Sequence, residues 1–181
     1  MQVLSDKEVA TRLRGGDVEA FAELYKRYHS RVRRFALKLL RDPSAADDIA
    51  QETFMKAQKG VGTLRSASSL RSWLFSIARN EVYIHFRKTR GNGRIREEDI
   101  WSGETPHEDM VNSETVEIVR GMIALLKPDY REVLILREYE QLSYSEIAEV
   151  TGDTESSVKS RLFKARKTLL KKLKPYFGGK E

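Results

Sequence analysis

The chain has 181 residues, a formal net charge of +6 and no cysteine. This length suits one or two small domains, the charge suits a polyanionic partner, and the lack of cysteine excludes disulfides and thiolate metal sites. No apolar run approaches the roughly 18 residues of a membrane span, and the N-terminal residues lack the apolar core of a signal peptide. We therefore expect no membrane insertion and a cytoplasmic location.

Apolar residues recur at intervals of three and four throughout, and no two-residue alternation is sustained, which predicts an all-α fold. Ser5 and Glu8 form a capping box for a short first helix that the glycines at 15–16 end. Asp17 caps a second helix that runs to about Leu40. Its predicted buried stripe comprises Phe21, Leu24, Tyr25, Tyr28, Val32, Phe35, Ala36 and Leu39.

The Arg-Asp-Pro sequence at 41–43 interrupts that helix, and Ser44 is the predicted N-cap of a third one. Carboxylates gather in its first turns, where they either complement the helix dipole or bind a partner. This acidic patch consists of Asp47, Asp48 and Glu52. The Gly and Ser content of residues 59–69 then predicts a loop.

A fourth helix is predicted from about Leu70 to Arg90. Its expected core-facing residues are Leu70, Trp73, Leu74, Ile77, Ala78 and Ile84. A second stripe interleaves aromatic rings with arginines: Arg79, Tyr83, Phe86, Arg87 and Arg90. Rings can stack on unpaired bases while guanidinium groups hold the backbone, so this stripe suits single-stranded nucleic acid. Half-buried packing of Tyr83 and Phe86 is the alternative.

Residues 91–112 combine Gly, Pro and an acidic excess with little periodicity, which predicts a flexible linker. Helices resume at Ser113, with an apolar stripe of Val116, Val119, Ile123 and Leu126. Pro128 is well placed in the first turn of the next helix, which ends near Tyr139. The pattern predicts two helical modules, residues 1–90 and 113–177.

The last stretch has the features of a helix-turn-helix motif. Ser143 and Glu146 make a capping box, Gly152 suits a left-handed turn, and Thr154 opens a longer helix. The apolar positions of that helix are Val158, Leu162, Ala165, Leu169 and Leu173. Its other face carries Lys159, Ser160, Phe163, Lys164, Arg166 and Lys167. Such a face can enter the major groove of DNA, and a merely solvated basic face is the alternative.

The sequence offers no catalytic constellation. His29, His85 and His107 are scattered, and none has a partner at metal-ligand spacing. There is no nucleophile elbow, phosphate-binding loop or dinucleotide fingerprint. We therefore expect a non-enzyme with no cofactor, no metal and no small-molecule substrate.

The ordered motifs resemble those of the extracytoplasmic-function (ECF) sigma factors of bacteria over nearly the whole chain. In the first module they are D-x-x-A-F at 17–21, DDIAQETF at 47–54 and SWL-x-x-IARN at 72–80. In the second they are LSY-x-EIA at 142–148 and VKSRL-x-KAR at 158–166. The resemblance implies that residues 1–90 form sigma region two, 91–112 the linker and 113–177 sigma region four.

The same resemblance implies an alternative sigma factor that directs core RNA polymerase to promoter DNA under the control of an anti-sigma factor. The clamp helices of the largest polymerase subunit would contact Asp47, Asp48, Gln51, Glu52 and Phe54. The minus-ten element would be recognised and opened by Arg65, Arg79, Asn80, Tyr83, Arg87 and Lys88. The minus-thirty-five element would be read by Ser156, Ser157, Lys159, Ser160, Arg161, Phe163, Lys164 and Arg166, with Arg161 and Arg166 on phosphates.

The chain departs from the family pattern in three places. These departures affect which promoter sequence is expected to be recognised, and not the expected activity as a sigma factor. Ile84 stands where an acidic residue is frequent, Ser156 and Ser157 replace a Gly-Thr pair, and Lys159 replaces an arginine. Two other functions are consistent with parts of the chain. A conventional helix-turn-helix regulator would be a dimer on a palindrome, and an RNA-binding helical adaptor is favoured only by the basic charge.

Overall fold

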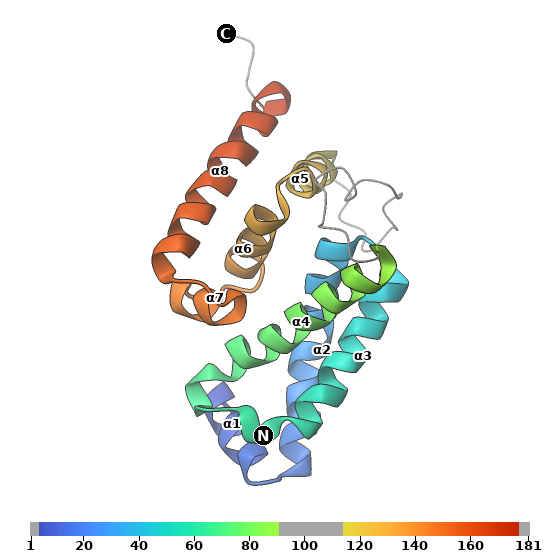
Figure 1. The fold of residues 1–181 in the computed structure, drawn as a ribbon, viewed down its shortest axis with the longest axis vertical. Helices are drawn as coiled ribbons and strands as arrows, with labels where there is room; N and C mark the ends of the chain where they lie inside the picture. The colour runs from blue at the N-terminus through green and yellow to red at the C-terminus, as the bar shows by residue number, and fades with distance from the viewer. Residues whose placement is uncertain (1–3, 91–113, 178–181) are drawn as a thin grey trace.

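The computed structural model describes residues 4–90 and 114–177, and within these two stretches every regular element is helical (Figure 1). This confirms the predicted all-α fold. The elements are α1 (Asp6–Arg14), α2 (Val18–Leu40), α3 (Pro43–Lys59), the 3-10 turns η1 (Val61–Thr63) and η2 (Ala67–Ser69), α4 (Leu70–Arg90), α5 (Glu114–Ala124), α6 (Pro128–Glu138), α7 (Tyr144–Thr151) and α8 (Glu155–Phe177). The predicted linker at 91–112 lies outside the described residues. None of the described helices is long and apolar enough to cross a membrane.

Local capping sets the start of most helices as predicted, with one correction. The Glu8 carboxylate accepts from the Ser5 backbone N–H at 2.7 Å, which completes the capping box of α1. The N-cap of α3 is Asp42, whose carboxylate accepts from the Ala45 N–H at 3.0 Å, and not Ser44. Pro43 explains the difference, because its fixed φ and missing N–H suit the first helical position, so the helix begins before Ser44.

The N-terminal module packs α1, α3 and α4 around α2. Tyr25 was predicted to be buried but is 44% exposed, and its ring stacks on His29 with centroids 4.6 Å apart. On α4, Phe75 and Val82 are fully buried although neither was predicted to be. Helices α2 and α3 cover one side of α4, and α7 covers another side. The buried residues of α4 therefore do not form a single stripe.

The C-terminal module contains the predicted helix-turn-helix. Both hydrogen bonds of the capping box between Ser143 and Glu146 are present, at 2.7 and 3.1 Å. Gly152 has φ +72°, the left-handed conformation that ends α7, and the Thr154 hydroxyl accepts from the Ser157 N–H to begin α8. Three of the predicted apolar positions of α8 are fully buried: Val158, Leu162 and Ala165.

The two modules are in contact. Helix α7 packs along α4, and α6 lies against α2, so that α4 runs between the rest of its own module and the helix-turn-helix (Figure 1). Side chains of α4 therefore contact both modules.

Candidate nucleic-acid and polymerase interfaces

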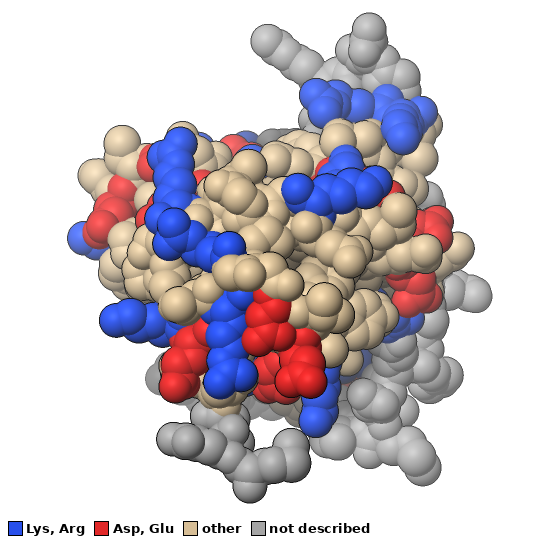
Figure 2. Space-filling view, turned by 90° about the horizontal axis from the view of Figure 1, so that it is seen from below, with Lys and Arg blue, Asp and Glu red and all other residues tan. Residues whose placement is uncertain are grey.

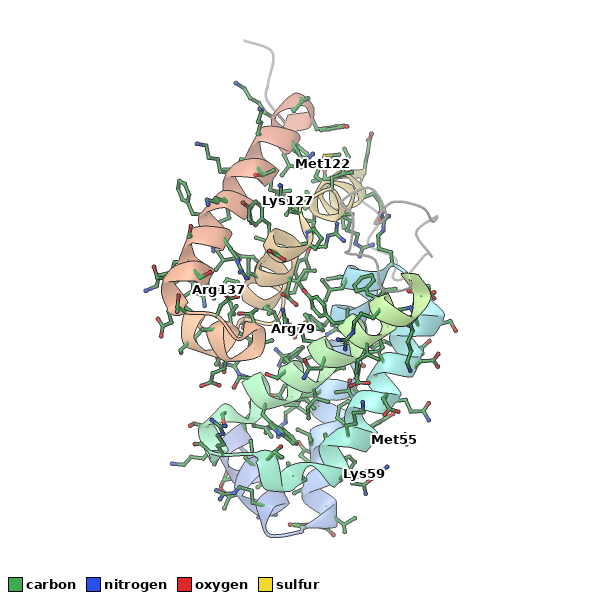
Figure 3. All side chains as sticks on the ribbon, in the orientation of Figure 1. Met55, Lys59, Arg79, Met122, Lys127 and Arg137 are labelled. Carbon is green, nitrogen blue, oxygen red and sulfur yellow. The ribbon has the colours of Figure 1, made fainter. Side chains whose placement is uncertain are left out.

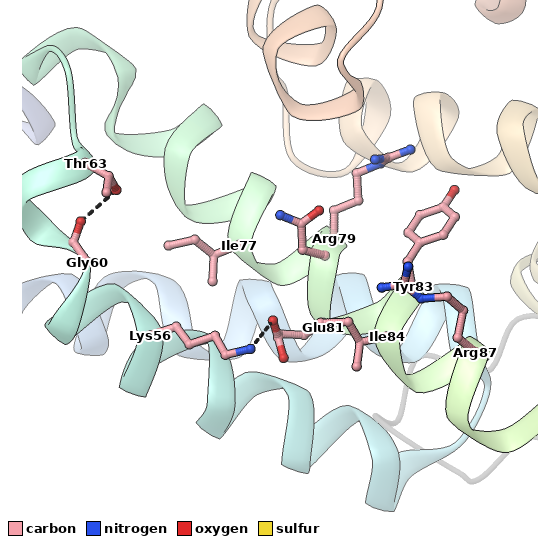
Figure 4. Close-up of a pocket in the computed structure, with 10 residues that line it drawn as sticks. Lys56, Gly60, Thr63, Ile77, Arg79, Glu81, Tyr83, Ile84 and Arg87 are labelled. Carbon is pink, nitrogen blue, oxygen red and sulfur yellow. Dashed lines mark hydrogen bonds and ion pairs between the residues drawn. The ribbon is translucent and has the colours of Figure 1, made fainter.

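A pocket of about 650 Å³ lies between the end of α3, the turn that follows it and α4 (Figure 4). Four of the six residues predicted to bind the minus-ten element line it: Arg79, Asn80, Tyr83 and Arg87. Arg65 and Lys88 are exposed but lie outside its lining. The structure therefore brings most of this predicted set together on one concave surface.

Other lining residues were not identified from the sequence. Lys56 donates to the mostly buried Glu81 at 2.7 Å, which ties α3 to α4 at the pocket (Figure 4). The Trp73 indole N–H donates to the Thr63 hydroxyl at 2.9 Å and fixes the turn after α3 on α4. These pairs join residues on different elements, so no local spacing could reveal them. Cations, an aromatic ring and apolar walls together suit an unstacked base.

Arg79 and Tyr83 also face the other module (Figures 3 and 4). Arg79 Nε donates to Glu132 Oε1 at 2.8 Å, the Arg79 guanidinium lies 4.5 Å from the centroid of the Tyr83 ring, and the Tyr83 hydroxyl donates to Glu132 Oε2 at 3.4 Å. Burial raises the pKa of Glu132, an effect that Arg79 partly offsets. Burial, followed by the charge of Glu132, raises the pKa of Tyr83 to about 12.

The half-buried packing considered for the two aromatic residues is present as well. Tyr83 and Phe86 are both partly buried and meet edge to face with centroids 6.4 Å apart, and Phe86 packs against the core. Phe86 thus has a packing role, whereas Tyr83 reaches both the pocket and the C-terminal module.

On α3, the carboxylates of the acidic patch lie on the surface, but Phe54 does not. Asp47, Asp48 and Gln51 are exposed and Glu52 is partly exposed. Phe54, which the family resemblance assigned to polymerase binding, is only 3% exposed. Its ring packs edge-on beneath Tyr25 with centroids 4.9 Å apart, because helical spacing places it on the core side of α3.

The acidic patch also lies beyond the first turn of α3, which begins at Pro43. Dipole stabilisation decays within that turn, so it accounts poorly for these carboxylates. Arg33 Nε donates to Asp47 at 2.5 Å, and this hydrogen bond lowers the pKa of Asp47. Seen from below in Figure 2, cations and carboxylates are interspersed rather than gathered in one basic field.

The predicted recognition residues all lie on α8. Six are exposed, and Ser157 and Arg161 are partly exposed: Ser156, Ser157, Lys159, Ser160, Arg161, Phe163, Lys164 and Arg166. Phe163 is 68% exposed, which leaves an apolar ring able to contact a thymine methyl group.

Two arginines of α8 pair with carboxylates of their own module. Arg161 pairs with Asp153 at 2.5 Å, and Arg166 pairs with Glu138 at 2.6 Å. The Glu138 hydrogen bond raises the pKa of Arg166. These pairs preorganise the guanidinium groups on an open helix face.

No group of three or more His, Asp or Glu side chains able to hold a metal ion occurs within residues 4–90 and 114–177. What the described residues do provide is a helix-turn-helix with an exposed basic face and a separate pocket lined by cations and an aromatic ring. The helix-turn-helix indicates a DNA-binding transcription factor.

Comparisons with known proteins identify the family. Residues 24–91 match the family model of sigma-70 region 2, and residues 117–169 match that of sigma-70 region 4. The ECF RNA polymerase sigma factor SigC of Mycobacterium tuberculosis is 35% identical over 94% of this chain and 95% of its own. The ECF RNA polymerase sigma-E factor of Haemophilus influenzae is 33% identical over 95% and 97%, respectively.

A solved structure agrees with these matches. The sigma factor RpoE of Bartonella quintana, in complex with the anti-sigma factor NepR, has a TM-score of 0.73 and 27% identity over 87% of this chain and 98% of its own. The chain belongs to the ECF family of RNA polymerase sigma factors. It is an alternative sigma factor that directs promoter-specific initiation and not an enzyme, since the polymerase performs the catalysis. This membership sets aside the conventional regulator and the RNA-binding adaptor.

Proposed function

We propose a division of labour in which residues 1–90 bind core polymerase and open the minus-ten element, residues 91–112 link the modules, and residues 113–177 read the minus-thirty-five element. The two family matches, at 24–91 and 117–169, fall on either side of the proposed linker and support this division.

The pocket between α3 and α4 carries the minus-ten assignment. It gathers Arg79, Asn80, Tyr83 and Arg87 around a space that can accept an unstacked base. Arg65 and Lys88 are exposed and lie close in sequence to the pocket residues Thr63 and Arg87. They contact phosphates of the same strand. Recognition here combines stacking on Tyr83 with charge on the backbone.

The exposed face of α8 carries the minus-thirty-five assignment. Lys159, Ser160, Phe163 and Lys164 point to solvent and contact base edges in the major groove. Ser156 and Ser157 lie at the start of α8 and bind phosphate there. Arg161 and Arg166 bind DNA phosphates, either in place of Asp153 and Glu138 or together with them.

The exposed carboxylates of α3 carry the polymerase assignment. Asp47, Asp48, Gln51 and Glu52 bind the clamp helices of the largest subunit, while Phe54 supports this surface from beneath. An anti-sigma factor is a further partner, supported by the likeness to RpoE solved with NepR. Because polymerase and promoter are cytoplasmic in bacteria, the protein acts in the cytoplasm.

Run-off transcription with the purified chain, core bacterial RNA polymerase and fragmented genomic DNA of the source organism tests the proposal. Transcripts that appear only with the chain establish its promoters, and their start sites define both elements. Absence of both transcripts and comigration with core polymerase would contradict it.

Asp48→Arg tests the polymerase surface separately. The charge reversal should abolish comigration with core polymerase while helicity is retained. Glu19→Arg, an exposed charge reversal near the start of α2, is the matched control and should bind normally. If Asp48→Arg assembles like the control, the α3 carboxylates are not the polymerase contact.

A further inference from the structure

Besides its polar residues, the pocket between α3 and α4 has an apolar wall. Ile77 and Ile84 both line the pocket, and each remains partly exposed although both were predicted to face the core. They lie on α4 on either side of Glu81 (Figure 4). Ile84 stands where an acidic residue is frequent in the family, so this wall is a particular feature of the present chain.

Asn80 lies between the two isoleucines on the same helix face. It follows Ile77 by three residues and precedes Ile84 by four, and residues at these spacings are neighbours on a helix surface. Its side chain is exposed and has no hydrogen-bond partner among the described residues. A free amide both donates and accepts, so it can pair with the hydrogen-bonding edge of an unstacked base. Every base offers a donor and an acceptor there, so Asn80 alone does not select one.

The other polar groups of the pocket favour a base with carbonyl oxygens. The side chains of Lys56 and Arg87 carry donors only. Two acceptor side chains of the lining are already engaged, because Glu81 accepts from Lys56 at 2.7 Å and the Thr63 hydroxyl is bonded within the turn after α3. Donors are therefore in excess, which suits the two carbonyl oxygens of thymine better than the exocyclic amino group of cytosine or adenine.

The apolar wall adds a second preference in the same direction. Thymine carries a methyl group at C5, and contact of this methyl with an apolar side chain is a direct form of base recognition. Ile77 and Ile84 offer such contacts on both sides of Asn80. An acidic residue at position 84 would instead place an acceptor there, which favours the amino group of cytosine.

We propose that this pocket selects thymine. Asn80 pairs with the hydrogen-bonding edge of the base, Ile77 and Ile84 enclose its C5 methyl group, and the ammonium group of Lys56 favours a carbonyl oxygen beside it. The inference rests on the proposed function of the pocket in minus-ten recognition and adds the identity of the base. The minus-ten element therefore contains a thymine whose methyl group contributes to binding.

The test uses holoenzyme assembled from the chain and core RNA polymerase, on a promoter mapped by run-off transcription. The minus-ten region of the template is left unpaired by mismatches, so that base-pair stability does not contribute. Each thymine of the element, on both strands in turn, is replaced by deoxyuridine, which lacks only the methyl group. One replacement should weaken binding about fourfold, the equivalent of one buried methyl group. Cytosine at that position should weaken binding about tenfold.

Variants of position 84 connect this effect to the apolar wall. Ile84→Ala should bind the thymine and deoxyuridine templates equally, and Ile84→Asp should bind the cytosine template at least as well as the thymine template. Leu125→Ala removes a leucine that is 43% exposed and lies outside the pocket, and as the matched control it should keep the fourfold preference. Circular dichroism verifies that each variant retains its helicity.

The outcomes separate this inference from the proposed function. If binding depends on minus-ten bases but no deoxyuridine replacement weakens it, thymine selection is overturned. A methyl effect that persists in Ile84→Ala would equally overturn the assignment of the isoleucine wall. If the holoenzyme yields no specific transcripts, or if no base change in the minus-ten element alters binding, the proposed function fails and the inference fails with it.

Discussion

The two proposed nucleic-acid surfaces of this sigma factor differ in how their arginines are paired with carboxylates. On α8, Arg161 and Arg166 pair with carboxylates of their own module, and the helix face remains open to solvent. On α4, Arg79 pairs across the module boundary with a buried carboxylate. The pairs on α8 hold the arginines in place on an exposed helix face, whereas the pair on α4 occupies Arg79 with a residue of the other module. Two similar basic stripes therefore differ in how accessible their arginines are, because a second module packs against only one of them.

The largest expected effect breaks the α4 arrangement. Arg79→Ala leaves Glu132 buried without its cation, which should lower the free energy of unfolding by about 3–5 kcal/mol. Adding Glu132→Gln should restore most of that stability, while minus-ten-dependent transcription stays lost because the arginine is absent. Thermal and denaturant unfolding of both variants, alongside run-off assays, check this. A double variant as unstable as Arg79→Ala would mean that the pair is not coupled.

The next effect is confined to α8. Lys159→Ala should weaken binding to the minus-thirty-five duplex by about 1–3 kcal/mol, and more on the preferred sequence than on altered ones, if the lysine contacts bases. Lys171→Ala, an exposed lysine further along α8, is the control. Fluorescence anisotropy on matched and mutated duplexes distinguishes the cases, since an equal loss on every duplex indicates a phosphate contact.

A smaller effect concerns Tyr144, whose ring lies 4.9 Å from the Arg137 guanidinium and 5.4 Å from Lys159 Nζ. Tyr144→Leu keeps an apolar side chain but removes the ring, so minus-thirty-five affinity should fall by about 0.5–1 kcal/mol. Combining it with Lys159→Ala should add little further loss. Fully additive losses in the double variant would show that the ring does not position the lysine.

The smallest effect is a pH dependence of the contact between α4 and α6. Burial raises the pKa of Glu132, with Arg79 opposing and Asp129 reinforcing the rise, so the folded chain binds a proton at this carboxylate more tightly than the unfolded chain does. The contribution of Glu132 to the free energy of unfolding should therefore be greatest below the ordinary carboxyl pKa and fall as pH rises through the raised value. Denaturant unfolding between pH 4.5 and 7.5, an interval that begins near that ordinary value and extends about three units above it, should show a falling free energy of unfolding with rising pH. Glu132→Gln should flatten this dependence, and an unaltered slope would assign it to other groups such as Glu140.

Helix boundaries and the family were available from the sequence because their determinants are local. The capping boxes at Ser5 and Ser143 join residues three apart, and Gly152 sets its turn by its own backbone freedom. The ordered motifs of both modules predicted a sigma factor, and the family matches confirm this. Ser44 was assigned wrongly because Pro43 decides where α3 begins.

Only the tertiary structure decided which side chains are accessible. Phe54 is buried beneath Tyr25 where α2 and α3 pack together, whereas Tyr25, which was predicted to be buried, is 44% exposed. The contact between Arg79 and Glu132 spans 53 residues and two modules, and it turns a predicted DNA-binding arginine into part of a closed interface. Periodicity describes one helix and one neighbour, whereas burial and ion pairing on α4 depend on every element that packs around it.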